Sequence, residues 1–211
     1  MYNLELGLSS GNCFINDGNI QAAVDLWISD PTTAEATYGN ISNWDTSCVT
    51  DMSRLFLNKA MFNDDISQWD VSNVTTMQNM FRGATNFNQD IGDWDMSSVT
   101  DMTGMFFSAT SFNQDIGVWD VSNVISLEGT FSNASSFNQD LGAWDVGNVT
   151  YMDDMLDGSA ISTANYDAIL QGWAAQTVQN NINLGAGGLF YCNAEAERQS
   201  CQPPRQGLNE G

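Results

Sequence analysis

Two series of aspartates recur every 25 residues and are the side chains best suited to holding a metal ion. One series follows a tryptophan, and the other precedes a branched aliphatic residue. Ca²⁺ takes several oxygen ligands, and stacked repeats would bring equivalent carboxylates close together. The calcium candidates are Asp70, Asp95, Asp120 and Asp145 of the first series and Asp90, Asp115 and Asp140 of the second.

The same aspartates also have a structural interpretation. In the pattern Trp-Asp-x-Ser-Asn, an aspartate can accept N–H bonds in a turn, which keeps the carboxylate ionised and satisfied. Neither an EF-hand spacing nor a glycine-rich calcium nonapeptide is present in the sequence. We therefore expect no cofactor, with calcium as the open alternative for the two series.

Motifs for catalysis are missing from the sequence. Without histidine, the Ser-His-Asp and Cys-His arrangements are excluded. There is also no G-x-S-x-G, P-loop or dinucleotide fingerprint. Each acid that stands out belongs to a repeated series, whereas an active site is usually a singular feature. We expect a protein that is not an enzyme.

The charge balance narrows the partners. Five Lys plus Arg stand against 26 Asp plus Glu, for a formal net charge of −21. Nucleic acids and anionic membrane surfaces are bound through basic patches, so neither is expected as a partner. No run of apolar residues is long enough to predict a membrane span. The first residues lack the pattern of a secretory signal, so an exported chain would have lost its leader.

The four cysteines lie outside the regular pattern or at a substituted position of it. No CxxC pair is present, and no histidine exists to complete a mixed zinc site. The sequence predicts two disulfides, Cys13–Cys48 and Cys192–Cys201, each locking one end of the repeats. Four buried free thiols in a cytosolic protein are the alternative.

Four sequons are acceptors for N-linked glycans if the protein is secreted by a eukaryote. Two of their asparagines also occupy a repeated column directly before an apolar run, where an asparagine would cap a helix. The sequons begin at Asn40, Asn73, Asn133 and Asn148, and the capping column contains Asn73 and Asn148.

The tryptophans establish the repeat. Trp44, Trp69, Trp94, Trp119 and Trp144 are separated by 25 residues each time, a period typical of solenoids. Apolar residues at i, i+3, i+6 and i+7 after each tryptophan motif predict a helix of two to three turns. Segments such as FNQDIGVW predict a short strand. We therefore predict an α/β solenoid, a right-handed leucine-rich-repeat-like coil of five repeats with helical caps at both ends.

Two columns are harder to assign. The tryptophans are either an exposed strip that stacks on sugars or a buried column with each indole N–H bonded to a backbone oxygen. The asparagines after the phenylalanines predict a ladder that bonds backbone groups left unpaired by a turn. These asparagines are Asn63, Asn88, Asn113 and Asn138.

The ends of the chain depart from the repeat, as expected of caps. A helix is predicted over residues 19–29, stopped by Asp30-Pro31, and another begins after Ser162 or Thr163. The predicted organisation is an N-terminal cap of strand and helix over 1–39, the repeats over 40–159, a C-terminal cap over 160–201 and a tail over 202–211.

The repeated pattern FNQDI-x-x-WDVSNVT-x-M-x-x-MF closely resembles that of the BspA-like leucine-rich-repeat surface proteins. The resemblance covers roughly residues 34–159 and rests on Trp-Asp and Met-x-x-Met-Phe repeated in phase. It implies a secreted or surface-anchored protein used in adhesion or partner binding, without enzymatic activity. The family has no agreed catalytic or ligand residues to transfer to this chain.

The sequence is compatible with two functions. The leading one is an extracellular or cell-surface module that recognises a protein or glycan on a host or neighbouring cell. The other is self-association as the structural subunit of a fibre or surface layer, either end to end or by strand donation. Alternation of Leu4, Leu6 and Leu8 makes residues 3–8 the predicted donor strand.

Overall fold

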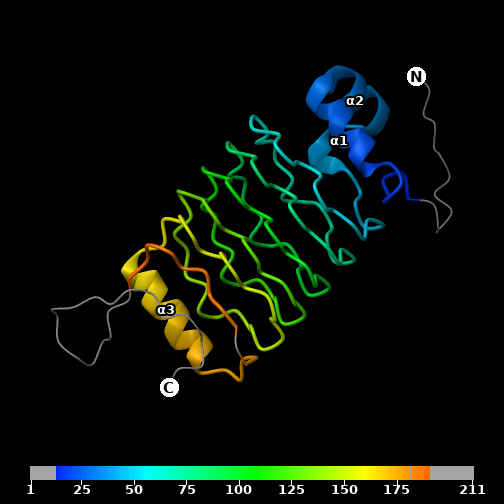
Figure 1. The fold of residues 1–211 in the computed structure, drawn as a ribbon. Helices are drawn as coiled ribbons and strands as arrows, with labels where there is room; N and C mark the ends of the chain where they lie inside the picture. The colour runs from blue at the N-terminus through cyan, green and yellow to red at the C-terminus, as the bar shows by residue number, and fades with distance from the viewer. Residues whose placement is uncertain (1–12, 181, 191–211) are drawn as a thin grey trace.

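The computed structural model describes residues 13–180 and 182–190, and its helices cover the two ends of a stack of coils (Figure 1). Each coil begins at one of the repeated tryptophans, and the five coils follow one another along the stack. The N-terminal elements are α1 (Ile20–Ser29), α2 (Pro31–Tyr38) and the 3-10 helix η1 (Ile41–Asn43), and the C-terminal element is α3 (Thr163–Ala174).

The predicted α/β solenoid with one strand and one helix in each repeat is wrong. Within the described chain, residues 44–161 form turns and single-residue parallel bridges, without a helix or a strand. The bridges join successive members of one column: Asp51, Thr76, Asp101, Ser126 and Tyr151. We call the eight residues that begin at each bridge a ladder segment. The five ladder segments span residues 51–58, 76–83, 101–108, 126–133 and 151–158.

Hydrogen bonds between coils replace the predicted helix. In the first ladder segment, the N–H groups of Met52, Arg54, Phe56 and Asn58 donate to carbonyls of the next coil at 2.7–3.0 Å. Of the N–H groups between them, those of Leu55 and Leu57 donate to the carbonyl three residues back, and that of Ser53 donates to the Asp51 carboxylate. An α-helix needs every amide to bond four residues back within its own segment. Half of these amides are instead committed to the neighbouring coil.

Left-handed residues explain why the chain takes this path. Two columns of the ladder segments have φ between 55° and 70°, a region that Gly, Asn and Asp enter most readily. One left-handed residue in every four interrupts a helix, although the apolar spacing is that of a helical face. The columns contain Arg54, Asn79, Gly104, Gly129 and Asp154, and Asn58, Gly83, Ser108, Asn133 and Gly158.

The predicted strands are tight turns. In the third coil the carboxylate of Asp115 accepts the amide of Gly117 at 3.1 Å. The N–H of Trp119 then donates to the carbonyl of Ile116 at 3.2 Å, three residues back. A strand would direct these groups sideways into a sheet, whereas here the turn satisfies them locally.

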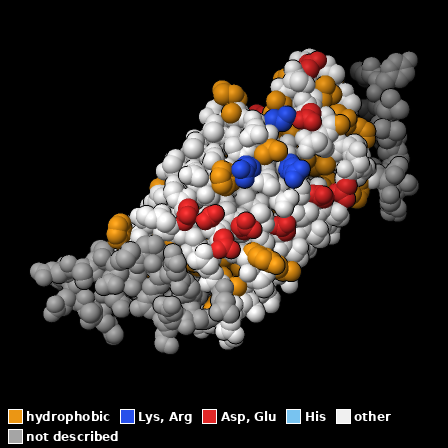
Figure 2. Space-filling view, viewed as in Figure 1, with side chains coloured by type: hydrophobic (Ala, Val, Ile, Leu, Met, Phe, Trp, Pro, Cys, Tyr) orange, Lys and Arg blue, Asp and Glu red, His pale blue; other side chains and the backbone are white. Residues whose placement is uncertain are grey.

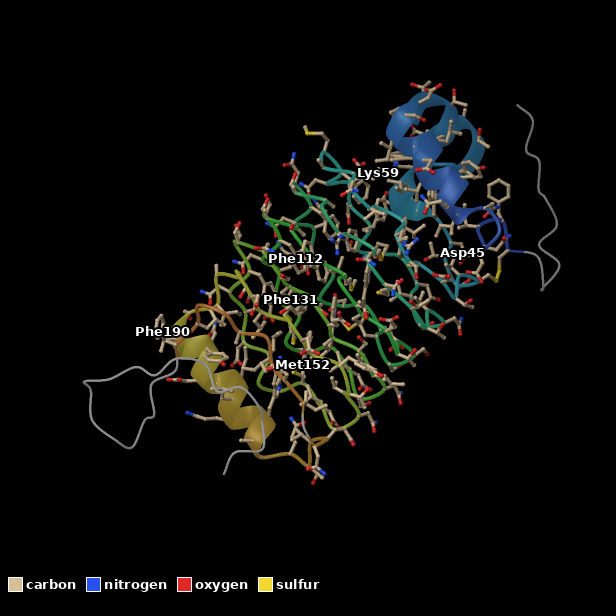
Figure 3. All side chains as sticks on the ribbon, viewed as in Figure 1. Asp45, Lys59, Phe112, Phe131, Met152 and Phe190 are labelled. Atoms are coloured by element: carbon tan, nitrogen blue, oxygen red, sulfur yellow. A yellow bond between two sulfur atoms is a disulfide. The ribbon has the colours of Figure 1, made fainter. Side chains whose placement is uncertain are left out.

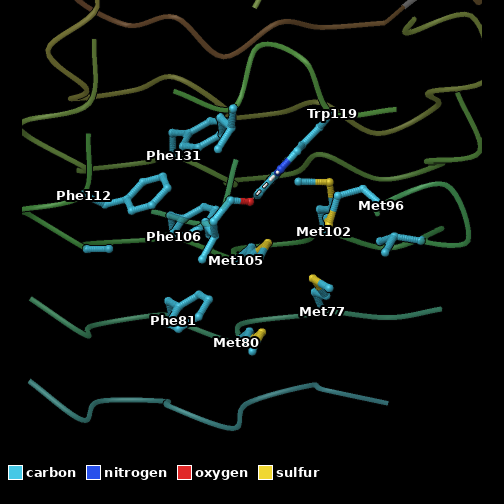
Figure 4. Close-up of a cluster of buried hydrophobic side chains, with 14 of the residues drawn as sticks. Met77, Met80, Phe81, Met96, Met102, Met105, Phe106, Phe112, Trp119 and Phe131 are labelled. Atoms are coloured by element: carbon cyan, nitrogen blue, oxygen red, sulfur yellow. Dashed lines mark hydrogen bonds between the residues drawn. The ribbon is translucent and has the colours of Figure 1, made fainter. Parts of the chain in front are cut away.

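Aromatic rings stack along the interior of the coils. Within a coil, the centroids of paired phenylalanine rings, such as Phe106 and Phe112, lie 3.9–4.0 Å apart. Equivalent phenylalanines of adjacent coils lie 5.3–6.0 Å apart in nearly parallel planes. Figure 4 shows these rings beside methionines of the same core. Thr130 interrupts the methionine column, and its buried hydroxyl donates to the carbonyls of Met102 and Leu127.

Helices lie where the sequence predicts them at the ends, with one addition. The predicted helix over 19–29 is α1, and the predicted C-terminal helix is α3, whose N-cap Ser162 accepts the amide of Asn165. Asp30-Pro31 stops α1 but also starts α2, because Asp30 accepts the amide of Thr33 and proline suits the first turn. The predicted strand over 3–8 lies outside the described residues.

Substitution of Gly129 by alanine tests the left-handed backbone. Its added Cβ would meet only the Phe107 ring, at an ordinary 3.7 Å, so the cost reports backbone conformation rather than a clash. We expect Gly129→Ala to lower the free energy of unfolding by about 1–2 kcal/mol in urea denaturation. The exposed Ser136→Ala is the control and should change it by less than about 0.5 kcal/mol. Equal effects would contradict the role of the left-handed column.

Candidate binding surface

The tryptophan column is buried, so it offers no strip for stacking on sugars. All five side chains are at most 4% exposed. From the second coil onward, each indole N–H donates to a backbone carbonyl of the preceding layer at 2.8–3.3 Å, as Trp119 does to Ile91 (Figure 4). Trp173 of α3 continues the series by donating to Leu141 at 2.9 Å. The helix thus takes the place of a sixth coil.

The predicted asparagine ladder is confirmed. The side-chain oxygen of Asn88 accepts the amide of Asn113 at 2.9 Å, and that of Asn113 accepts the amide of Asn138 at 2.8 Å. The ladder ends at the C-terminal cap, where the side-chain oxygen of Asn138 accepts the amide of Ser162 and the side-chain amide of Asn165. These side chains are therefore structural and are committed to the stacking of the coils.

The aspartates that follow tryptophan each close a turn. Their carboxylates accept the backbone amide two residues on at 3.0–3.1 Å. In the first three coils, a serine hydroxyl also donates to the same oxygen at 2.6 Å. Hydroxyl and amide donors of Ser47, Ser97 and Ser122 hold the pKa of Asp45, Asp95 and Asp120 below the ordinary value.

The aspartates of the second series also close turns. Asp90, Asp115 and Asp140 accept the amides of Gly92, Gly117 and Gly142 at 2.8–3.1 Å. Over residues 13–180 and 182–190, no three His, Cys, Asp or Glu side chains gather as a metal site. The structure thus does not bring the seven calcium candidates together as ligands; each carboxylate serves its own turn.

The sequon asparagines are all exposed, and each takes part in a hydrogen bond. The side-chain amides of Asn73 and Asn148 donate to the carbonyls of Ser47 and Ser122 in the preceding coil at 2.9 and 2.7 Å. The helix-capping role predicted for them is wrong, since no helix follows in the coils. Asn40 accepts the amide of Ser42, and Asn133 donates to the hydroxyl of Ser132. Glycosylation of the four sequons stays a prediction.

A disulfide joins Cys13 to Cys48, with their Cα atoms 6.0 Å apart, as the sequence analysis expected. Cys48 occupies the column in which Asn73 and Asn148 hold the preceding coil. The first coil has no preceding coil, so a covalent link to the N-terminal cap replaces that hydrogen bond. The predicted partners Cys192 and Cys201 lie outside the described residues.

Asp17 caps free donors of the first coil, a role that was not predicted from the sequence. In later coils the amide at the Thr50 position donates to the preceding coil, as Thr75 does to Thr50 at 2.9 Å. In the first coil the Asp17 carboxylate accepts the amide and hydroxyl of Thr50, both at 2.7 Å, and the amide of Asp51 at 3.1 Å. Burial raises the pKa of Asp17, but these three donors outweigh it, and the pKa is lowered overall.

One outer surface is not repeated from coil to coil. The outward side chains of the ladder segments, which we call the ladder face, change from Asp51, Ser53 and Arg54 in the first coil to Tyr151, Asp153 and Asp154 in the fifth. Figure 2 shows the Lys and Arg side chains in the N-terminal half of this view, a group of Asp and Glu beyond them toward the C-terminal end, and further acids at the N-terminal end itself. Beside the face, Ile125 is 47% exposed, and on it Tyr151 is 58% exposed.

Aromatic and charged groups meet in the middle of the ladder face. The guanidinium of Arg82 lies 3.9 Å from the ring centroid of Phe107, a cation–π contact between the second and third coils. Arg54, Lys59 and Arg82 are the only Lys or Arg residues between positions 13 and 190. The ladder face therefore carries cations on its first two coils and only acids among its charges on the last two.

Comparison with protein families gives two matches, over residues 30–117 and 89–187, to the model described as "Mycoplasma protein of unknown function, DUF285". The two matches together span well over half of the chain. The chain belongs to the DUF285 family. No curated protein and no solved structure gives a significant match.

Membership of the DUF285 family agrees with the predicted resemblance at a coarse level, that of a repeat-containing, surface-like protein. In the described part of this DUF285 chain, no helix has the length and apolar character needed to cross a membrane.

The asparagine ladder can be tested at Asn113, in the middle of the stack. Asn113→Ala removes the acceptor for the Asn138 amide and for the Gln139 side chain, each at 2.8 Å. We expect the free energy of unfolding to fall by about 1–2 kcal/mol. Asn113→Asp keeps an acceptor oxygen and, measured in high salt to screen its charge, should lose clearly less. A loss as large as that of the alanine variant would refute the ladder's contribution.

The carboxylate of Asp17 makes stability depend on pH. Because its pKa is lowered in the folded state, its ionised form stabilises the fold above the ordinary pKa, and this contribution disappears as the pH falls through the lowered value. The difference in stability between the wild type and Asp17→Asn should be largest near neutral pH. It should begin to shrink as the pH falls to about 3.9 and disappear below the lowered pKa of the folded state. Thermal unfolding at several pH values measures it. A gap independent of pH, or one also seen for exposed Asp93→Asn, would contradict this role.

Proposed function

We propose that this protein is a non-catalytic recognition module that acts outside the cell or on its surface. One observation carries the proposal: the inward columns are nearly the same in every coil, whereas the ladder face differs from coil to coil. Packing and hydrogen bonding account for the repeated residues. The residues that change are left free to meet a partner, as on other repeat scaffolds.

The interior supports such a role because it makes the ladder face rigid. Four amides per pair of adjacent coils donate from one ladder segment to the next, and the rings behind them are stacked. A surface held in place before binding loses little conformational entropy when a partner docks. The Cys13–Cys48 disulfide supports an oxidising location, where such bonds persist.

The chemistry of the ladder face favours a protein partner, and a glycan is the alternative. Acidic Glu128, Asp153 and Asp154 lie near exposed Ile125 and Tyr151. Carboxylates around an exposed aromatic ring match a basic protein surface and speed its encounter through charge complementarity. The coarse family likeness to repeat-containing surface proteins supports a partner on a host or neighbouring cell. The finer kinship with BspA-like surface proteins is part of this proposal.

Self-association is the second candidate, because the cations of the ladder face lie on its first two coils and its last two coils carry only acids among their charges. Two copies packed antiparallel on this face would place opposite charges together. Such a contact is closed and gives a dimer, so a fibre or surface layer would also need the dimers to associate end to end. The donor strand that the sequence predicts over 3–8 lies outside the described residues, so it adds nothing to this case.

A pair of matched variants tests the recognition role. Purified protein is first examined by light scattering and then screened on arrays of extracellular proteins and glycans. Glu128→Lys with Tyr151→Ala should weaken binding of any array partner by about tenfold or more. Asp93→Lys with Val118→Ala removes one exposed acid and one exposed apolar side chain from another column and should leave the affinity unchanged.

Two results would contradict the proposal. Equal weakening by both double variants would show that the ladder face is not the binding surface. A regular oligomer that dissociates in the Glu128→Lys, Tyr151→Ala variant, without any array partner, would assign the protein to the structural class instead.

A further inference from the structure

A groove lies where the N-terminal helices meet the first coil. Its volume is about 440 Å³, within the range of about 300–1,000 Å³ typical of ligand pockets. Trp27 and Ile28 of α1 and Pro31 of α2 form one wall, and residues 58–62 with Asp64 form the other. Because Asn58 ends the first ladder segment, the groove continues the N-terminal end of the ladder face.

The walls of the groove are largely apolar and open. Met61 is 82% exposed and Ile28 is 38% exposed, although both are large hydrophobic side chains. Single exposed hydrophobic residues are common, but here two of them face a groove that also contains Trp27 and Phe62. Methionine is flexible and polarisable, and it is over-used at surfaces that bind peptides. The groove is therefore suited to apolar side chains.

Lys59, Trp27 and Asp64 of the groove are already paired, which holds these side chains in place. The ammonium of Lys59, which Figure 3 labels beside the N-terminal helices, lies 2.7 Å from the carboxylate of Asp25 in α1. The indole N–H of Trp27 donates to Asp64 at 2.9 Å, and its ring packs edge-on against Trp44 with centroids 6.1 Å apart. Pairing neutralises the one cation in the lining and holds the tryptophan wall in position before any ligand arrives.

Acidic side chains outnumber basic ones around the groove, where Lys59 is paired with Asp25 and Arg54 lies on the adjoining ladder segment. Residues 13–43 contain Asp17, Asp25, Asp30 and Glu35 and no Lys or Arg. Asp30 directly precedes Pro31 of the lining, and Asp64 belongs to the opposite wall. A ligand with positive charge beside its apolar groups would be attracted by these carboxylates, whereas an acidic ligand would be repelled.

We propose that this groove docks a short peptide segment of the partner protein, with apolar side chains between Trp27, Ile28 and Met61 and a Lys or Arg beside Asp30 or Asp64. The inference rests on the proposed recognition function and adds the site and the chemistry of one contact. A second copy of this chain is a poorer occupant, because each copy is strongly acidic and repels the other.

A displayed peptide library supplies the probe. Random peptides about 12 residues long are selected on the full-length protein, and the enriched sequences are synthesised for affinity measurement by fluorescence anisotropy. We expect enriched peptides to combine two or more apolar residues with an adjacent Lys or Arg. Met61→Asp and Ile28→Asp should each weaken their binding by about tenfold or more. The control Val118→Asp changes a residue that is 80% exposed on another surface and should leave it unchanged.

Methyl NMR gives a second readout that does not depend on the variants. Within the described chain, Met61 is the exposed methionine, and Met52, Met77 and the others are buried. Binding in the groove should shift the Met61 methyl signal and leave those of Met102 and Met152 in place. Unchanged near-UV circular dichroism of the variants excludes unfolding as the cause of lost binding.

Several results would overturn the inference. They are a library without enrichment, enriched peptides that lack basic residues, unchanged binding to Met61→Asp, or a dimer that Met61→Asp dissociates. Other results would distinguish failure of the groove inference from failure of the proposed function. An array partner lost in the Glu128→Lys, Tyr151→Ala variant but retained by Met61→Asp would reject the groove alone, whereas enriched peptides without any array partner would support the groove and reject the ladder face.

Discussion

Hydrogen bonds from each ladder segment to the next are the interaction on which the other features depend. They require alternate amides to leave their own coil, which in turn requires left-handed residues at fixed positions such as Gly104 and Ser108. They also set the separation of the coils, at which the phenylalanine rings stack. With that separation fixed, the asparagine side chains and the indole N–H groups reach their partners one layer away.

The sequence predicted the repeat and its interior well, because both follow from periodicity. Buried columns, the asparagine ladder, α1 and α3 all depend on local patterns that recur or stand beside clear caps. The local structure of the coils was predicted wrongly, since the spacing of Val99, Met102 and Met105 fits a helical face as well as a turn whose amides bond the next coil. The contrary signal was present in the Asn, Gly and Asp of the left-handed columns.

The polar residues likewise include some whose roles were predictable from the sequence and some whose roles were not. Turn-closing roles of the aspartates were predictable because donor and acceptor are two residues apart. Asp17 was not, since it acts on Thr50 across the junction between cap and coil and belongs to no repeated column. The groove was hidden for a related reason: one wall depends on α2, which starts at the proline that ends α1, and the other wall belongs to the first coil. Juxtapositions that occur once leave no periodic trace in a sequence.

The amides that join the coils have one further consequence. A few, such as those of Thr75 and Asn86, donate to the preceding coil, but the four that each ladder segment donates to the next outnumber them. These four point toward α3, and the carbonyls that accept them point back toward α1. Their peptide dipoles add along the stack, as they do in a helix and unlike those of an antiparallel sheet. The stack therefore has a partly negative end at the first coil, where Gln21 donates to the carbonyl of Leu55, and a partly positive end at the fifth. Arg54 and Lys59 lie near the first end, and Asp153, Asp154 and Asp157 lie at the second. Along the ladder face, cations therefore lie near the end where the backbone is partly negative, and acids lie at the end where it is partly positive.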